Sequence, residues 1–168
     1  MTDSAHISPR VTRALMAEDA IYGLILVSAV LVASGTADAT ALQTFVNVFL
    51  TVIVFFAAHV YAGALARLAG SEGASGFRAS IGAAAKNSSG MLLASVAPLV
   101  ILLLGTTRVI EDDTALWVAL IADTLILAAL GWVAVARWST HWLARLVGAA
   151  IAAGFGGALY IVKVIVGH

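Results

Sequence analysis

The chain has 168 residues, of which 62% are hydrophobic and only 11% are charged. Soluble domains carry about 25% charged residues, so the composition argues against a soluble core of this length and favours a lipid bilayer. Nine basic and nine acidic side chains balance, so there is no basic excess to suggest a nucleic-acid partner. The absence of cysteine excludes disulfides, thiolate catalysis and thiolate metal sites.

Five apolar stretches follow one another along the chain. A helix needs about 20 mostly apolar residues to cross a hydrocarbon core about 30 Å thick. Lipid cannot satisfy exposed backbone polar groups, and a barrel would show alternating polarity instead. We therefore predict an all-α, polytopic transmembrane helix bundle that forms a single domain over residues 1–168. The five predicted spans cover about residues 17–34, 42–66, 91–109, 115–136 and 146–166.

The first predicted span is the shortest, and it begins with two carboxylates, Glu18 and Asp19. Arg10 and Arg13 precede it, and a basic segment before a short apolar run is also the pattern of a cleaved signal peptide. The two acidic residues interrupt that pattern at the junction. A retained membrane span is therefore the favoured interpretation.

The second span carries a polar sector along one face. Thr44, Asn47 and Thr51 share a stripe by helical spacing, and His59 lies within reach of the same sector. One interpretation is the lining of a pore or hydrated groove. The other, which is somewhat favoured, is a set of interhelical hydrogen bonds worth about 0.6 kcal/mol each.

Between the second and third spans, residues 67–90 are rich in Gly, Ala and Ser and predict a cytoplasmic loop. Within it, residues 77–86 (FRASIGAAAK) predict either a short interfacial helix or a flexible linker. Pro98, inside the third span, removes one backbone hydrogen bond and predicts a kink.

Asp123, near the middle of the fourth span, is the deepest carboxylate. An unpaired ionised carboxylate at that depth costs about 3 kcal/mol or more, so Asp123 must be neutral, hydrated or paired. It is either a group that binds a proton or cation, or half of an ion pair that fixes helix packing. Lys163 near the outer end of the fifth span is the first candidate partner, and Arg108 is the second.

Small residues mark the fifth span. Gly148, Ala152 and Gly156 form one small-xxx-small ridge, and residues 149, 153 and 157 form a neighbouring ridge. Such ridges let helices approach closely. They predict tight packing within the bundle or, as the alternative, a homo-oligomer.

The basic residues predict the orientation of the chain in the membrane. Two of them, Arg108 and Lys163, fall on one side of the predicted membrane, and seven fall on the other. Because cytoplasmic loops carry the excess of Lys and Arg, we expect a multi-pass protein of the inner (plasma) membrane with its N-terminus inside and its C-terminus outside. The seven are Arg10, Arg13, Arg67, Arg78, Lys86, Arg137 and Arg145.

This orientation puts Glu18, Asp19 and His59 at similar depth near the cytoplasm. His59 lies seven residues before the predicted end of its span, which is about 10 Å of helix. A carboxylate beside a histidine fits a proton relay or a cation entrance, because histidine titrates near neutral pH. The favoured alternative is a structural hydrogen bond that ties the first two spans together.

The sequence predicts no enzyme activity, no catalytic residues, no metal site and no cofactor. The four histidines, at positions 6, 59, 141 and 168, are scattered without the spacing of a zinc site. The GFGG segment at residues 154–157 lies inside an apolar helix, which is the wrong context for phosphate binding.

Three segments, AEDAIYGLILVSA at 17–29, VFFAAHVYAGALARL at 54–68 and ARWSTHWLARLVG at 136–148, together resemble a group of uncharacterised bacterial multi-pass membrane proteins. A weaker similarity links two short segments to the bacterial relatives of the lysosomal transmembrane potassium channels. Their arginine, aspartate, aromatic and histidine positions would correspond to Arg13, Asp19, Phe56 and His59. The Phe-Ser motif before the aspartate is missing and five spans replace six, so no filter residues are carried over.

Two functional hypotheses follow. In the first, the protein is a channel or transporter for a small cation or a proton, and its path is lined by the residues at the end of this paragraph. In the second, it is a non-catalytic structural or accessory subunit that packs against a larger membrane complex. A continuous hydrated path favours the first, and full pairing of the polar residues in a dry bundle favours the second. The path residues are Glu18, Asp19, Asn47, Thr51, His59 and Asp123.

Overall fold

The computed structural model describes residues 9–34, 40–70 and 76–166, without the side chains of residues 9–17, 163 and 166. All regular structure in these ranges is helical, which confirms the all-α prediction. The helices are α1 (Pro9–Ser34), α2 (Ala41–Gly70), α3 (Phe77–Thr106), α4 (Asp112–Ala136) and α5 (Trp142–Val166).

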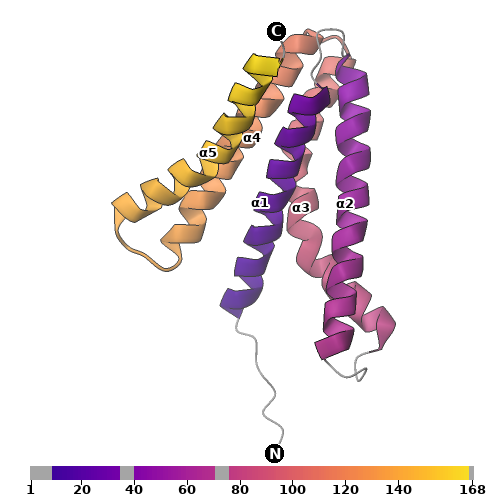
Figure 1. The fold of residues 1–168 in the computed structure, drawn as a ribbon, viewed down its shortest axis with the longest axis vertical. Coiled ribbons are helices and arrows are strands. Elements are labelled where there is room, and N and C mark those ends of the chain that lie inside the picture. The colour runs from indigo at the N-terminus through magenta and orange to yellow at the C-terminus, as the bar shows by residue number, and fades with distance from the viewer. Residues whose placement is uncertain (1–8, 35–39, 71–75, 167–168) are drawn as a thin grey trace, which may run out of the picture.

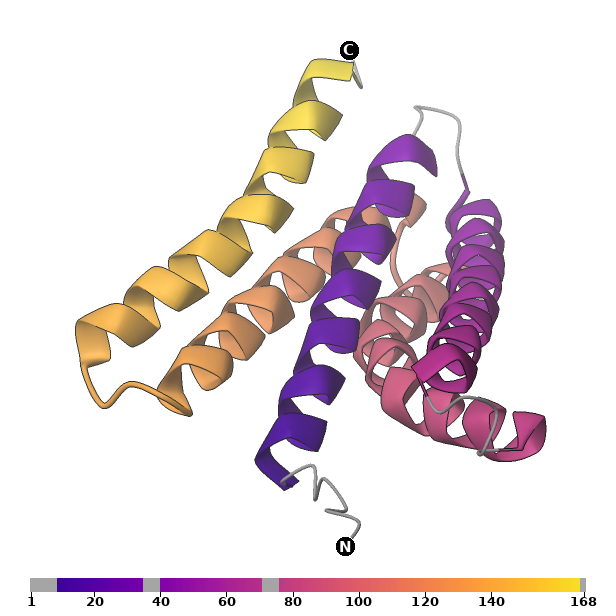
Figure 2. The ribbon, with the colours of Figure 1, turned by 60° about the horizontal axis from the view of Figure 1, so that its bottom comes forward.

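Consecutive helices run in alternating directions, so that the beginning of α1 and the end of α5 lie at opposite ends of the bundle (Figure 1). The central helix is α1, which contacts each of the other four helices. The α2–α3 hairpin packs on one side of it and the α4–α5 hairpin on the other, as Figure 2 shows from a second direction. The bundle is thus two antiparallel hairpins that both pack against α1 and that also contact each other directly through α3 and α4.

Four of the helices, α2, α3, α4 and α5, are long and apolar enough to cross a membrane. Their apolar residues face outward in large numbers; Leu125 and Val54, for example, are 65% and 68% exposed. Since a bilayer is the solvent that accepts such a surface, the fold is that of an integral membrane protein. The described part of α1 is not among the four.

The two helices on either side of the predicted 67–90 loop, α2 and α3, are longer than predicted. The sequence predicted a loop over residues 67–90, but α2 continues to Gly70 and α3 already begins at Phe77. The segment 77–86 is therefore helical, as the first turns of a long helix rather than a short separate one. Ala is the best helix former, and Ser80 and Ala84 are buried against neighbouring helices, so propensity and packing both extend α3.

Buried positions repeat every seven residues along α3. This spacing keeps one seam of a helix facing its neighbours, as in left-handed coiled coils. Pro98 occupies one of these buried positions, and α3 continues through it. The first set is Ala84, Met91, Pro98 and Gly105, and the second is Ser88, Ser95 and Leu102.

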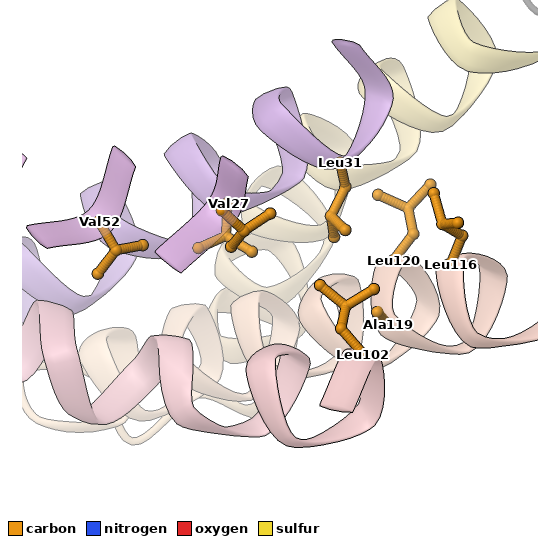
Figure 3. Packing of buried hydrophobic residues seen from close by; sticks show 8 residues of the cluster. Val27, Leu31, Val52, Leu102, Leu116, Ala119 and Leu120 are labelled. Carbon is orange, nitrogen blue, oxygen red and sulfur yellow. The ribbon is translucent and has the colours of Figure 1, made fainter. Parts of the chain in front are cut away.

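The apolar core lies where α1, α2, α3 and α4 meet. Leu31 of α1 and Leu102 of α3 approach Leu120 of α4 in Figure 3, and all three side chains are at most 1% exposed. Val48 and Val52 complete the cluster from α2. This core fills the half of the bundle that is distant from the beginning of α1.

The contact between α4 and α5 depends on small residues. A Cβ atom added to Gly131 of α4 would lie 2.5 Å from the carbonyl oxygen of Gly148 and 2.7 Å from the Cβ of Ala152. One added to Gly156 would lie 2.5 Å from the hydroxyl of Thr124. The ridge of Gly148, Ala152 and Gly156 thus packs against α4 of the same chain.

This geometry predicts the effect of one methyl group. Gly131→Ala should destabilise the fold by about 1–3 kcal/mol, because the new Cβ meets backbone that cannot rotate away. The expected result is a lower unfolding temperature of the protein in detergent, followed by circular dichroism. Gly154→Ala is the matched control, since nothing lies within 4 Å of a Cβ there. Equal unfolding temperatures for the two variants would contradict the close α4–α5 contact.

Candidate functional site

The first polar centre lies at the end of the bundle where α1 begins. Asp19 of α1 faces His59 of α2, with 3.8 Å between the Oδ1 and Nε2 atoms. The Ser88 hydroxyl of α3 lies close enough to the same carboxylate to stabilise its charged form. Three helices therefore meet at one half-buried carboxylate.

Aromatic rings hold the imidazole of His59 in place. Phe55 lies one turn earlier on α2, with its ring centroid 5.3 Å from that of His59. Tyr22, nearly one turn after Asp19 on α1, contributes a ring at 6.3 Å. His59 therefore contacts α1 through both a carboxylate and an aromatic side chain, while a third of its own side chain stays exposed.

A pocket of about 410 Å³ opens beside this pair. Its walls come from α1, α2 and α3 and combine charged, polar and small side chains. Glu18 and Asp19 line it together with His59 and Arg67. The structure thus brings together the three residues that the sequence predicted to lie at similar depth, and adds Arg67, Asn87 and Ser88 to them.

The second polar centre is Asp123, which is fully buried in the bundle. Its Oδ2 atom accepts a hydrogen bond from the hydroxyl of Ser28 on α1. Its Oδ1 atom has no hydrogen-bond partner among the described residues. Asp123 thus lies inside the protein, not toward lipid.

Of the two predicted cationic partners of Asp123, the structure describes the side chain of Arg108 but not that of Lys163. Arg108 is exposed in the connection between α3 and α4, where its φ of 59° is left-handed. The side chain of Lys163 is outside the described residues. The predicted Asp123–Lys163 pair therefore stays a prediction.

The polar sector of α2 is divided among different surroundings. Asn47 is exposed, and its Nδ2 atom donates a 3.3 Å hydrogen bond to the hydroxyl of Ser34 on α1. Thr51 is half-buried, whereas Thr44 is fully buried and its hydroxyl has no partner among the described residues. These side chains therefore do not share one common lining.

Apolar side chains separate the two polar centres along α1. Asp19 and Ser28 are nine residues apart, which corresponds to about 13 Å of helix. Between them the buried side chains of α1 are Ala20, Leu24 and Val27, and the last two have no exposed surface. In this conformation the two centres are distinct sites.

Within the described ranges, no three His, Cys, Asp or Glu side chains converge as metal ligands would. The chemistry that the two centres offer is hydrogen bonding, proton binding and ion pairing. Comparison with family models, curated proteins and solved structures finds no match for this chain.

The bond between Ser28 and Asp123 generates a prediction about stability. Ser28→Ala should cost about 1–3 kcal/mol, because it leaves a buried carboxyl group without its donor. In an Asp123→Leu background, the same change should cost much less. A double-mutant cycle on unfolding in detergent measures the difference.

Ser95→Ala serves as the matched control for that cycle. Ser95 is equally buried, but its hydroxyl bonds to the carbonyl of Leu92 in its own helix. Its effect should therefore be the same in both backgrounds. A Ser28→Ala cost that is unchanged by Asp123→Leu would contradict the contact between α1 and α4.

Proposed function

We propose that this protein is a five-span membrane protein that binds a proton or small cation at Asp123 and exchanges it with the pocket beside Asp19 and His59. The observation that carries the proposal is a fully buried carboxyl group, with one oxygen bonded to Ser28 and the other without a described partner. Ionisable groups at membrane depth mark proton relays and ion pathways more often than they mark lipid-facing surface.

The membrane arrangement behind the proposal has α1 as the fifth span. Leu24, Val27 and Leu31 of α1 are buried by the four apolar helices around it, so α1 lies at the same depth as they do. The end of α2, the beginning of α3 and the connection from α4 to α5 lie toward the same end of the bundle as the beginning of α1 (Figure 1). The basic residues in or near these segments are Arg67, Arg78, Lys86, Arg137 and Arg145. By the positive-inside rule, that end faces the cytoplasm, and the membrane in this proposal is the plasma membrane.

Proton binding suits Asp123 on energetic grounds. A charged carboxylate without a counter-ion is costly in a low-dielectric interior, whereas a protonated carboxyl group accepts from Ser28 and remains neutral. The gain or loss of one proton at Asp123 therefore strongly changes the electrostatic energy of this site. A group of this kind can couple occupancy to a rearrangement of the helices around it.

In this proposal, the first polar centre, at Asp19 and His59, is the entrance through which the proton or cation reaches Asp123. The Asp19 carboxylate lies 3.8 Å from the His59 imidazole, and a carboxylate beside a histidine can hold a proton or a cation next to the pocket. The buried residues Leu24 and Val27 close the way between the two centres. This closure favours a gated carrier that changes conformation during transport over a continuously open pore.

A second candidate function is an accessory subunit of a larger membrane complex. The observation that favours it is the pairing of predicted path residues with side chains of other helices: Asn47 with Ser34, Asp19 with His59, and Asp123 with Ser28. Polar pairs of this kind also hold helices together without carrying ions. A transport measurement separates the two functions.

The deciding experiment is a flux assay on the purified full-length chain in liposomes. With an imposed membrane potential and a pH-sensitive dye inside, the wild-type protein should carry protons, and Asp123→Asn should lower the rate about tenfold or more because it removes the titrating group. His59→Ala should lower the rate as well, at unchanged unfolding temperature. Potassium, suggested by the weaker family resemblance, is the second cation to test.

Asp113→Asn is the matched control, because this exposed carboxylate begins α4 at the other end of the bundle. It should leave the flux unchanged. Absence of flux above empty liposomes for both cations, or an unchanged rate in Asp123→Asn, would overturn the transport proposal and leave the accessory function.

A further inference from the structure

The pocket between α1, α2 and α3 has the size and lining of a small-molecule site. Its volume of about 410 Å³ falls in the range of ligand pockets, which is roughly 300–1,000 Å³. Ala62, Ala66 and Ala84 form part of its wall, and their small side chains leave the space open. Most of the other residues in the wall are polar or charged.

Opposite charges line this pocket without pairing to each other. Glu18 projects from α1 and Arg67 from the last turn of α2, and both side chains are exposed. Neither forms an ion pair with any described residue. Asp19, in contrast, pairs with His59 and lies near Ser88 in the same wall.

We propose that this pocket binds a zwitterion that carries a primary ammonium group and a phosphate or carboxylate group. The ammonium group would bind between the carboxylates of Glu18 and Asp19, and the anionic group would bind the guanidinium of Arg67. Asn87, also in the wall, offers an amide to either end of the ligand.

The charges select against simpler ligands. A simple anion can pair only with Arg67 and a simple cation only with the two carboxylates, whereas a zwitterion satisfies both ends of the pocket at once. Arginine binds planar or tetrahedral oxyanions through two parallel hydrogen bonds. This geometry favours a phosphate or carboxylate over halide ions.

The lining also selects the kind of ammonium group. Quaternary ammonium groups are recognised by cages of aromatic rings. The wall of this pocket has no Phe, Tyr or Trp, and it presents carboxylates that accept hydrogen bonds. An ammonium group with N–H donors is therefore favoured over a trimethylated one.

Two sources supply this chemistry. One is the phosphoethanolamine headgroup of a membrane lipid, and the other is a free zwitterion in the aqueous phase. The inference does not depend on ion movement through Asp123, because binding at the pocket is measured without a gradient and the flux assay is measured without the ligand.

The test measures binding to the purified full-length protein in detergent by isothermal titration calorimetry. The probes are short-chain phosphatidylethanolamine, its phosphatidylcholine and phosphatidylglycerol counterparts, and free phosphoethanolamine. Phosphatidylethanolamine should bind about tenfold more tightly than phosphatidylcholine, because the trimethylated headgroup cannot donate to Glu18 and Asp19. Free phosphoethanolamine that binds equally well identifies an aqueous ligand; binding of the lipid alone identifies a headgroup site.

Charge-removing variants locate the binding to this pocket. Glu18→Gln and Arg67→Gln should each weaken binding about tenfold, since each removes one charge-assisted contact. Glu111→Gln and Arg78→Gln, exposed residues outside the pocket wall, are the matched controls and should leave the affinity unchanged. Equal binding of all three lipids, no saturable binding of any probe, or full affinity in both pocket variants would overturn the proposal.

Discussion

The arrangement of the bundle depends on the buried polar groups of the central helix, α1, which need hydrogen-bond partners on other helices. Because α1 lies between two hairpins, its polar atoms must find partners on other helices or remain unsatisfied at a cost of about 1–3 kcal/mol each. Buried Ser28 meets this requirement with Asp123 of α4, and partly buried Asp19 meets it with His59 of α2. An exposed bond between Ser34 and Asn47 of α2 adds a third contact of α1.

These contacts fix the angle and height of the helices more firmly than apolar packing does. Lipid tails are as apolar as leucine, so burial of Leu24 or Leu31 gives little preference for one neighbour over another within a membrane. A directional hydrogen bond from Ser28 admits one rotation of α4. The glycine contact at Gly131 then sets the distance at which α5 follows α4.

Much of the fold was predictable because the bilayer imposes a length and a composition on each helix. The apolar stretches of α2 to α5 predicted four helices that are able to span, and helical spacing put Asp19 and His59 at one depth. Partner choice was not predictable in this way. Ser28 is an ordinary small residue in an apolar run, and only the rotation of α1 relative to α4 gives it a role.

The loop predicted over residues 67–90 is a second case in which the sequence did not show which neighbours a segment packs against. Gly, Ala and Ser are equally frequent in linkers and in closely packed membrane helices, so composition does not separate the two. A seven-residue spacing of buried positions, which begins at Ala84, identifies the helix, and it becomes visible only once the neighbours are known.

The contact of Ser28 with Asp123 joins residues 95 positions apart, and this separation has a consequence for biogenesis. The chain is synthesised from its N-terminus, so α1 is made long before α4 exists. During that interval the Ser28 hydroxyl has only the carbonyl groups of its own helix as acceptors. The hairpin of α4 and α5, which is made last among the five helices, therefore supplies the partner that Ser28 of α1 needs.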